Sequence, residues 1–291
     1  MKHILITGAN SFLGKSFERY AENWPDRYSV ETISVTDDKW IKESFTGYDT
    51  VFHVAGLAHI DTGILTKKKK ELYYKVNRDL AVKTAKKAKQ DGVKQFIFMS
   101  SAVVYGNSAH IGKQKVINKN EIPSPQNIYA DSKYQAEQQL LPLQSDTFNV
   151  VIIRSPMIYG KGCKGNYSTL HHLIKKIPIF PYIKNERSML YIGNFVEFVR
   201  LMIDDEEHGI FWPQNKEYVN TSDMVKKICQ VNGKKINIVK GFTWLFKFLS
   251  FFIKYINRAF GNLAYDKEMS MYKKPYQLYS FDESIELTEK E

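Results

Sequence analysis

The first half of the chain alternates short apolar runs with stretches whose apolar residues recur at helical spacing. Strands are predicted at His3–Thr7, Tyr28–Val35, Thr50–Val54, Gln95–Met99 and Phe148–Arg154, and helices at Phe12–Asn23, Lys67–Gln90 and Asn127–Leu141. The centre of the last strand, Val150–Ile153, is wholly apolar, as in strands buried on both faces of a parallel sheet. This alternation predicts an α/β fold with a Rossmann-type, doubly wound parallel sheet.

The pattern is less regular after Gly160. Helical spacing recurs at Asn194–Asp204, Thr221–Gln230 and Phe242–Phe260, with short strand-like pieces between them. We therefore expect a Rossmann domain over residues 1–160 and a smaller, mostly helical substrate-binding domain over residues 161–291. Some segments of the second part are expected to return to the Rossmann sheet.

The charge of the chain narrows the class of partner. A formal net charge of +11 favours phosphates, nucleic acid or an anionic membrane surface. No nucleic-acid-binding motif accompanies that charge, so we expect no nucleic acid partner. Cys163 and Cys229 form no CxxC pair, the N-terminus has no signal peptide, and no apolar run reaches about 20 residues. These features predict a cytoplasmic protein.

The segment Thr7–Gly14 (TGANSFLG) separates the first strand from the first helix. Such a turn needs Gly8 for its backbone angles, and Gly14 lets helix and strand pack closely. The helix N-terminus then offers N–H groups and a positive dipole end to a pyrophosphate. The segment is neither GxGxxG nor a P-loop, because five residues rather than four separate Gly8 from Gly14. A glycine turn that binds no ligand is the alternative interpretation.

Two further segments supply candidate chemistry. The strand Gln95–Met99 runs into Ser100–Gly106 (SSAVVYG), and strand C-terminal ends are where ligands sit in open α/β sheets. Tyr129 and Lys133 then lie four residues apart, on one face of a helix. A nearby ammonium and a positive nicotinamide would both favour the phenolate, and a serine hydroxyl could hydrogen-bond the same substrate oxygen. The pair alone is weak, because Tyr and Lys are abundant in this chain.

Together these segments resemble the extended short-chain dehydrogenases/reductases, that is, the NAD-dependent epimerase/dehydratase family. The resemblance covers most of the chain and includes TGANSFLG, DTVFHVAG, SSAVVYG, YADSK, RSPMIYG and RSMLYI. It implies that Tyr129 is the acid/base, that Lys133 holds the nicotinamide ribose and lowers the tyrosine pKa, and that Ser101 assists at the substrate oxygen. Asn77 is implied to be a packing residue near the site, and no metal site is expected.

The resemblance also implies a cofactor site for NAD or NADP. Its pyrophosphate would lie on the first segment, and the backbone of Ala55 and Gly56 along the cofactor; the pyrophosphate residues are Gly8, Asn10, Ser11, Phe12, Leu13 and Gly14. Ser11 replaces the family's middle glycine, and one strand–helix unit is missing or merged between Val35 and Asp49. Asp37 could bond the ribose hydroxyls of NAD. Ser34 and Thr36 could instead accept the 2′-phosphate of NADP.

Two positions after Gly160 are candidates for the substrate. The segment Lys164–Asn166 opens a helical pattern, so Asn166 would stand at a helix N-terminus, which suits a phosphate. Arg187 precedes a strand-like segment, and its guanidinium matches a diphosphate. In the family the matching arginine binds the diphosphate of a sugar nucleotide. A surface arginine in a charged loop is the alternative.

The segment Phe242–Ile256 carries an apolar stripe that includes Phe246, Phe252 and Ile256, with Lys247 and Arg258 opposite. The preferred interpretation is a core helix of the substrate domain. The alternative is an interfacial helix that makes peripheral contact with an anionic membrane. Family members commonly form homodimers through helices equivalent to Lys67–Gln90 and Asn127–Leu141, so we expect a homodimer.

The resemblance implies an NAD(P)-dependent enzyme that acts at C4 of a nucleotide-diphosphate sugar. No Asp-Glu pair stands beside Ser101, which argues against a dehydratase. The short chain, the Lys164–Asn166 segment and the tail Phe281–Glu289 favour a UDP-4-keto-deoxyhexosamine reductase of bacterial surface polysaccharide synthesis. A UDP-hexose or UDP-N-acetylhexosamine 4-epimerase is the alternative. A non-catalytic dinucleotide sensor is a third possibility, although such proteins usually lose the tyrosine or the lysine.

Overall fold

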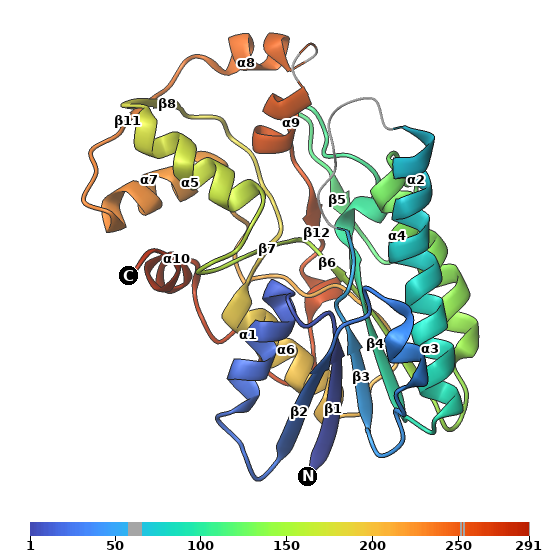
Figure 1. Ribbon diagram of the computed structural model, residues 1–291. Coiled ribbons are helices and arrows are strands. Elements are labelled where there is room, and N and C mark those ends of the chain that lie inside the picture. The colour runs from blue at the N-terminus through green and yellow to red at the C-terminus, as the bar shows by residue number, and fades with distance from the viewer. Residues whose placement is uncertain (58–65, 251, 253, 291) are drawn as a thin grey trace. The chain divides into compact units, whose positions relative to one another are not determined.

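The computed structural model describes residues 1–57, 66–250, 252 and 254–290 (Figure 1). The chain divides into two compact units, each with its own core. Unit 1 comprises Met1–Gly106, Pro123–Ser155 and Val196–Trp212. Unit 2 comprises Asn107–Ile122, Pro156–Phe195 and Pro213–Glu291.

Unit 1 is built on a parallel sheet with the strand order β10-β6-β4-β3-β1-β2. The strands are β1 (Lys2–Thr7), β2 (Tyr28–Ile33), β3 (Thr50–His53), β4 (Gln95–Ser101), β6 (Asn149–Ser155) and β10 (Gly209–Phe211). The side chains of Phe96–Phe98 and Val150–Ile153 are fully buried, as expected where helices cover both faces of a parallel sheet. The predicted α/β fold with a Rossmann-type sheet is confirmed.

Helices flank the sheet of unit 1 on both sides (Figure 1). On one side lie α1 (Phe12–Ala21) and the part of α6 (Ile192–Asp204) that belongs to this unit; on the other lie α2 (Lys67–Tyr74), α3 (Leu80–Gln90) and α4 (Ile128–Leu140). A π-helical turn, Lys75–Asp79, joins α2 to α3. The 3-10 turns of this unit are η1 (Asp38–Lys42), η3 (Ala102–Tyr105) and η4 (Leu141–Leu143).

The connection from β2 to β3 is shortened, as the sequence predicts. The single 3-10 turn η1 replaces a full helix there. Trp40 in this turn is 2% exposed and stacks near Phe45, with 6.2 Å between the ring centroids. Those two rings fill the part of the core that a helix would otherwise cover.

Unit 2 is mostly helical, with short parallel strand pairs β5–β12, β7–β9 and β8–β11. The strands are β5 (Val116–Ile117), β7 (Met157–Tyr159), β8 (Ile179–Pro181), β9 (Met189–Tyr191), β11 (Asn237–Val239) and β12 (Ala264–Tyr265). The helices are α5 (Asn166–Lys176), α7 (Thr221–Val231), α8 (Thr243–Leu249), α9 (Lys254–Phe260) and α10 (Phe281–Glu289), with the 3-10 turn η5 (Glu268–Ser270). Tyr159, Ile183 and Met224 lie at the centre of its core.

The prediction of one helix over Phe242–Phe260 is wrong. The segment forms two helices, α8 and α9, and Ser250 is the C-cap of the first. The Ser250 hydroxyl donates to the Lys247 carbonyl at 2.7 Å, and the Asn257 amide donates to the Ser250 carbonyl at 3.0 Å. These side chains take over backbone groups that a continuous helix would use. Ile253, which the predicted stripe includes, and Phe251, which lies on the basic side of the predicted helix, are outside the described residues.

Candidate active site

The glycine loop between β1 and α1 packs directly on the loop after β3. Gly8 has φ +109°, which favours glycine, and a Cβ there would lie 2.9 Å from the Ala55 backbone nitrogen. A Cβ on Gly14 would lie 3.0 Å from Ile6 Cγ2 and 3.2 Å from a Val54 methyl. The structural roles predicted for both glycines are therefore confirmed: the first permits the turn, and the second permits close helix–strand packing.

Ser11, which replaces a glycine of the family pattern, is the N-cap of α1. Its hydroxyl accepts a hydrogen bond from the Gly14 N–H at 3.5 Å. Phe12 and Leu13, the first two helical residues, have N–H groups without intrahelical acceptors, as at any helix N-terminus. Asn10 is exposed beside them. The loop thus keeps donors for an anionic group even though one donor bonds to the serine.

Ser101 and Tyr129, far apart in the sequence, come together in unit 1. Ser101 ends β4, and Tyr129 lies in the first turn of α4, whose N-cap Asn127 accepts from the Ala130 N–H at 2.9 Å. Burial raises the pKa of Tyr129, and a side-chain hydrogen bond with Ser101 acts in the opposite direction. The side chains of Ser101 and Tyr129 are therefore in contact, and burial outweighs the effect of Ser101 on the tyrosine pKa. The lowering of this pKa by Lys133 and a bound nicotinamide stays a prediction.

Lys133 lies one turn further along α4 and is almost completely buried. Its Nζ is 4.5 Å from the centre of the Phe98 ring, and a Cβ on Gly56 would lie 3.2 Å from it. No hydrogen bond to Nζ is formed by the part of the chain that the structure describes. Burial lowers the pKa of Lys133 to about 7, and the negative charge of Glu137 partly counteracts that shift.

Asn77 fixes the loop after β3 to helix α4. The residue is buried in the π-helical turn, and its Oδ1 accepts from the Leu57 N–H at 2.8 Å. Its Nδ2 donates to the Leu57 carbonyl at 3.2 Å and to the Ser132 hydroxyl at 3.1 Å. These bonds hold the Gly56 backbone beside Lys133. π-Helical turns often occur at functional sites.

The sequence analysis missed a buried ionic network under the site. Arg154 Nη2 lies 2.6 Å from Glu137 Oε2, and both side chains are under a tenth exposed. Ser100 Oγ donates to Glu137 Oε1, and Arg154 Nη1 donates to Tyr105 Oη at 2.6 Å. Glu137 is four residues beyond Lys133, so the repeat from Tyr129 to Lys133 continues by one step and could have pointed to it.

His53 is a second group that the sequence analysis missed. It is fully buried at the end of β3, with Nδ1 2.7 Å from Thr7 Oγ1, and it stacks between Phe96 and Phe98. Its Nε2 is buried, and no described residue gives it a hydrogen-bond partner. Burial and then the positive charge of Lys133 lower its pKa to about 3. The ring is therefore neutral across the physiological range.

The residues of unit 1 fit a dinucleotide. The close packing at Gly8 and Gly14 leaves backbone donors at a helix N-terminus, and the buried amine of Lys133, which no described residue provides with a hydrogen-bond acceptor, stands beside Gly56. Asp37 is more than half exposed after β2, where its side chain caps η1 by accepting from the Lys39 N–H at 3.1 Å. Ser34 and Thr36 hydrogen-bond each other at 2.9 Å.

Arg187, in unit 2, has no acidic partner among the described residues. Its Nη1 donates to the Arg258 carbonyl at 2.5 Å, at the end of α9. Burial lowers its pKa to about 10, so it stays charged. A helix C-terminus attracts a cation, which explains why the guanidinium is held there. Asn166 is the exposed first residue of α5, and the helix has no side-chain N-cap.

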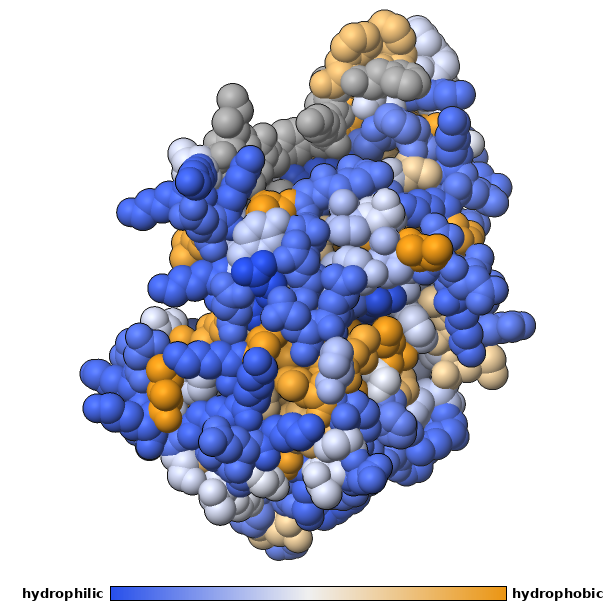
Figure 2. Space-filling view, turned by 90° about the vertical axis from the view of Figure 1, so that its right-hand side faces the viewer, coloured by the Kyte–Doolittle hydropathy of each residue, from blue (hydrophilic) through white to orange (hydrophobic). Residues whose placement is uncertain are grey.

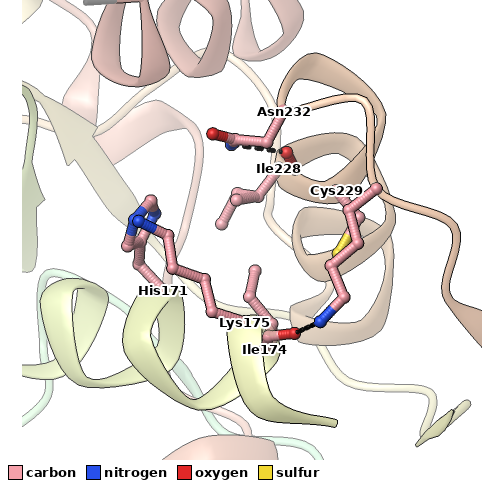
Figure 3. A pocket seen from close by; sticks show the side chains of 7 residues that line it. His171, Ile174, Lys175, Ile228, Cys229 and Asn232 are labelled. Carbon is pink, nitrogen blue, oxygen red and sulfur yellow. Dashed lines mark hydrogen bonds between the residues drawn. The ribbon is translucent and has the colours of Figure 1, made fainter. Parts of the chain in front are cut away.

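Two cavities lie within unit 2, and neither is lined by Asn166 or Arg187, the candidate substrate residues of this unit. The smaller, between α5 and α7, has a volume of about 20 Å³ and holds at most one water (Figure 3). The larger, of about 320 Å³, borders Gly160–Cys163, His171 and the buried carboxylate of Glu289. No group of three His, Cys, Asp or Glu side chains that could hold a metal occurs among the described residues.

Comparison with known proteins shows to which family the chain belongs. The chain is 31% identical over 251 residues to the UDP-glucose 4-epimerase of Vibrio cholerae, spanning 78% of this chain and 75% of that protein. It is 29% identical over 259 residues to the N-acetyl-alpha-D-glucosaminyl-diphospho-ditrans,octacis-undecaprenol 4-epimerase of Escherichia coli O157:H7, spanning 80% of this chain and 73% of that protein.

A solved structure agrees on the fold. The UDP-glucuronic acid 4-epimerase of Bacillus cereus has a TM-score of 0.72 and 15% sequence identity, over 98% of this chain and 96% of that one. Residues 4–212 match the model of the NAD dependent epimerase/dehydratase family, which confirms the predicted resemblance and the nicotinamide cofactor, NAD or NADP. The chain belongs to the NAD-dependent epimerase/dehydratase family of enzymes.

Proposed function

We propose that the chain catalyses hydride transfer at C4 of a nucleotide-diphosphate sugar. The observation that carries this proposal is the contact of Ser101 with Tyr129, together with Lys133, one turn further along α4, beside Gly56. The bound nicotinamide supplies the hydride chemistry, and its positive oxidised form favours an ionised tyrosine. The chain itself must hold and move one proton.

In this proposal Tyr129 Oη accepts a proton from the oxygen on C4, or returns one to it. Ser101 donates a hydrogen bond to the same oxygen, as its contact with Tyr129 allows. Lys133 holds the ribose of the cofactor, and Asn77 fixes the loop on which the cofactor lies. In unit 2, Arg187 binds the diphosphate of the substrate, with Asn166 as a second contact.

A 4-epimerase is the form of this reaction that the relatives' names support. Both relatives described above are named as 4-epimerases. An epimerase returns the hydride to the opposite face of C4, so the cofactor shows no net oxidation. The reductase that the Lys164–Asn166 segment and the Phe281–Glu289 tail favour is the second candidate, and it oxidises one cofactor per substrate.

The test uses purified protein and two assays. UDP-glucose/UDP-galactose and UDP-GlcNAc/UDP-GalNAc interconversion is followed by chromatography, and NADH or NADPH oxidation is followed with a UDP-4-keto-6-deoxy-N-acetylhexosamine. Tyr129→Phe is expected to lower the active rate by about 10²–10⁴-fold. The matched control is Tyr134→Phe on the same helix, which should stay active.

Interconversion without net cofactor oxidation supports the epimerase, and stoichiometric oxidation supports the reductase. Equal activity of the wild type and Tyr129→Phe would overturn the assigned acid/base. Silence in both assays, with no NAD(H) released from the denatured protein, would favour another function altogether.

A further inference from the structure

Helix α8 and the residues that flank it expose four aromatic side chains. Phe242, Trp244, Phe248 and Phe252 are 45%, 71%, 58% and 72% exposed. The rings of Phe248 and Phe252 lie 5.3 Å apart, and Trp244 lies one helical turn before Phe248, so Trp244, Phe248 and Phe252 form one surface, which we call the aromatic face. Figure 2 shows hydrophobic side chains at the top of the view, the height at which Figure 1 places α8.

The opposite side of α8 is anchored to the core of unit 2. Leu245, Phe246 and Leu249 are half-buried there, and the Phe246 ring lies 5.7 Å from the ring of Phe260 in α9. The helix is therefore held by one apolar side and presents a second apolar side to solvent. A helix needed only for packing would expose polar residues there.

The segment of the chain that carries the aromatic face has charges of one sign. Residues 233–265 contain six Lys and Arg residues and no Asp or Glu. Lys240 and Lys247 are exposed, and no acidic side chain in the described part of the chain pairs with Lys247. Such a segment attracts a surface that carries many negative charges.

We propose that the aromatic face docks on the surface of an anionic lipid bilayer. Phenylalanine and tryptophan side chains gain free energy by entering the boundary between headgroups and acyl chains, and lysines beside them bind acidic headgroups. A second copy of the chain fits less well, because two such segments would bring like charges together. Nucleic acid also fits less well, because its interfaces are more polar than four exposed apolar rings.

The docking is peripheral rather than membrane-spanning. Among the residues that the structure covers, no helix is long and apolar enough to cross a bilayer. Helix α8 has only seven residues, so it can enter the interface to the depth of its side chains and no further. The proposal concerns binding alone, and its test requires no substrate or enzymatic turnover.

The test is flotation of the full-length protein with vesicles of phosphatidylcholine, with or without phosphatidylglycerol. We expect binding to the anionic vesicles that weakens at high salt. Lys240→Gln with Lys247→Gln should weaken it by about tenfold or more, because each basic residue near the surface contributes about fivefold. Trp244→Ser with Phe248→Ser and Phe252→Ser should also reduce it by about tenfold or more, through lost apolar insertion.

Matched controls change equally exposed residues elsewhere. Lys67→Gln with Lys68→Gln removes the same charge from another helix, and Ile122→Ser with Met271→Ser removes side chains that are 80% and 78% exposed. Both controls should bind as the wild type does. Unchanged melting temperatures show that the variants are folded.

Insertion of Trp244 has its own readout. Lipids with brominated acyl chains should quench part of the tryptophan fluorescence of the wild type. This quenching should be absent in the Trp244→Phe variant. Absence of vesicle binding, or equal loss in the Lys67/Lys68 control, overturns the proposal. It is equally overturned if the aromatic variant changes only the oligomeric state in light scattering, or only binding to single-stranded DNA.

Discussion

Helix α4 carries two buried ionisable groups one turn apart, and their surroundings are opposite. Glu137 accepts hydrogen bonds from Arg154 and Ser100, so its charge is fully compensated. Lys133 Nζ lies 4.5 Å from the centre of the Phe98 ring and has no hydrogen-bond acceptor among the described residues. Since an unpaired buried charge is costly, this contrast supports a structural role for Glu137 and the functional role that we propose for Lys133.

The difference teaches where to look for a site in a fold of this kind. A saturated buried network fixes β4, β6 and α4 to one another. A buried polar group that has no hydrogen-bond partner in the described part of the chain, such as Lys133 Nζ or His53 Nε2, is retained although it lowers stability. The contrast makes different predictions for the two halves of the helix.

The largest effect is expected from breaking the buried ion pair of Glu137 with Arg154. Glu137→Ala leaves the Arg154 guanidinium buried without its carboxylate, which should lower the free energy of unfolding by about 3–5 kcal/mol. Urea denaturation of the purified variant measures this. The double variant Glu137→Leu with Arg154→Met removes both charges and should recover most of that loss. A double variant as unstable as Glu137→Ala alone would contradict the assignment.

The next largest effect concerns the stability of the protein at acidic pH. Because the pKa of His53 is lowered to about 3, the unfolded chain takes up a proton below pH 6.5 that the folded chain refuses. Stability should fall as pH falls from 6.5 towards 3, by about 2–3 kcal/mol at pH 4.5 from this group. His53→Gln keeps a partner for Thr7 and should flatten that slope, whereas His172→Gln, at an exposed position, should not. The measurement is urea denaturation across this pH range.

Removing Lys133 should change stability in the direction opposite to the removal of Glu137. The pKa of Lys133 is lowered to about 7, so below pH 10.5 the unfolded chain binds a proton more tightly than the folded one. The free-energy cost of burying Lys133 therefore grows as the pH falls from 10.5 to 7. Lys133→Met should therefore abolish activity and yet raise the free energy of unfolding by about 2 kcal/mol near pH 9. A destabilised Lys133→Met protein would remove the distinction between the two halves.

Local spacing is what made parts of this molecule predictable from sequence. Gly8 and Gly14, and the pair Tyr129 and Lys133, each lie within one turn or loop, so their geometry follows from neighbouring residues. Five of the six strands of the parallel sheet were also predicted, because burial on both faces leaves continuous apolar runs such as Val150–Ile153, whereas the three-residue edge strand β10 was not.

Partners distant in the chain made the rest unpredictable. The contact of Glu137 with Arg154, and that of His53 with Thr7, depend on which strands become neighbours in the sheet. The break after α8 was missed for a different reason. Apolar periodicity continues through Ser250, while the bond from Asn257 to its carbonyl ends the helix there.

The smallest expected effect concerns Ser11, in the glycine loop between β1 and α1. Its hydroxyl stabilises α1 by bonding the Gly14 N–H, a donor that a pyrophosphate could otherwise use. Ser11→Gly should cost only a few tenths of a kcal/mol in stability, because glycine is a tolerated N-cap. It should tighten cofactor binding about twofold to tenfold, by freeing roughly one hydrogen bond. Ser11→Ala loses the cap without restoring the open glycine loop, so it should lose about 1 kcal/mol of stability and gain less affinity. Titration of each protein with NAD and NADP, beside its melting curve, measures both quantities. Weaker cofactor binding by Ser11→Gly than by the wild type would contradict this prediction. It would mean that the serine hydroxyl itself contacts the cofactor, so that Ser11 favours binding rather than weakening it.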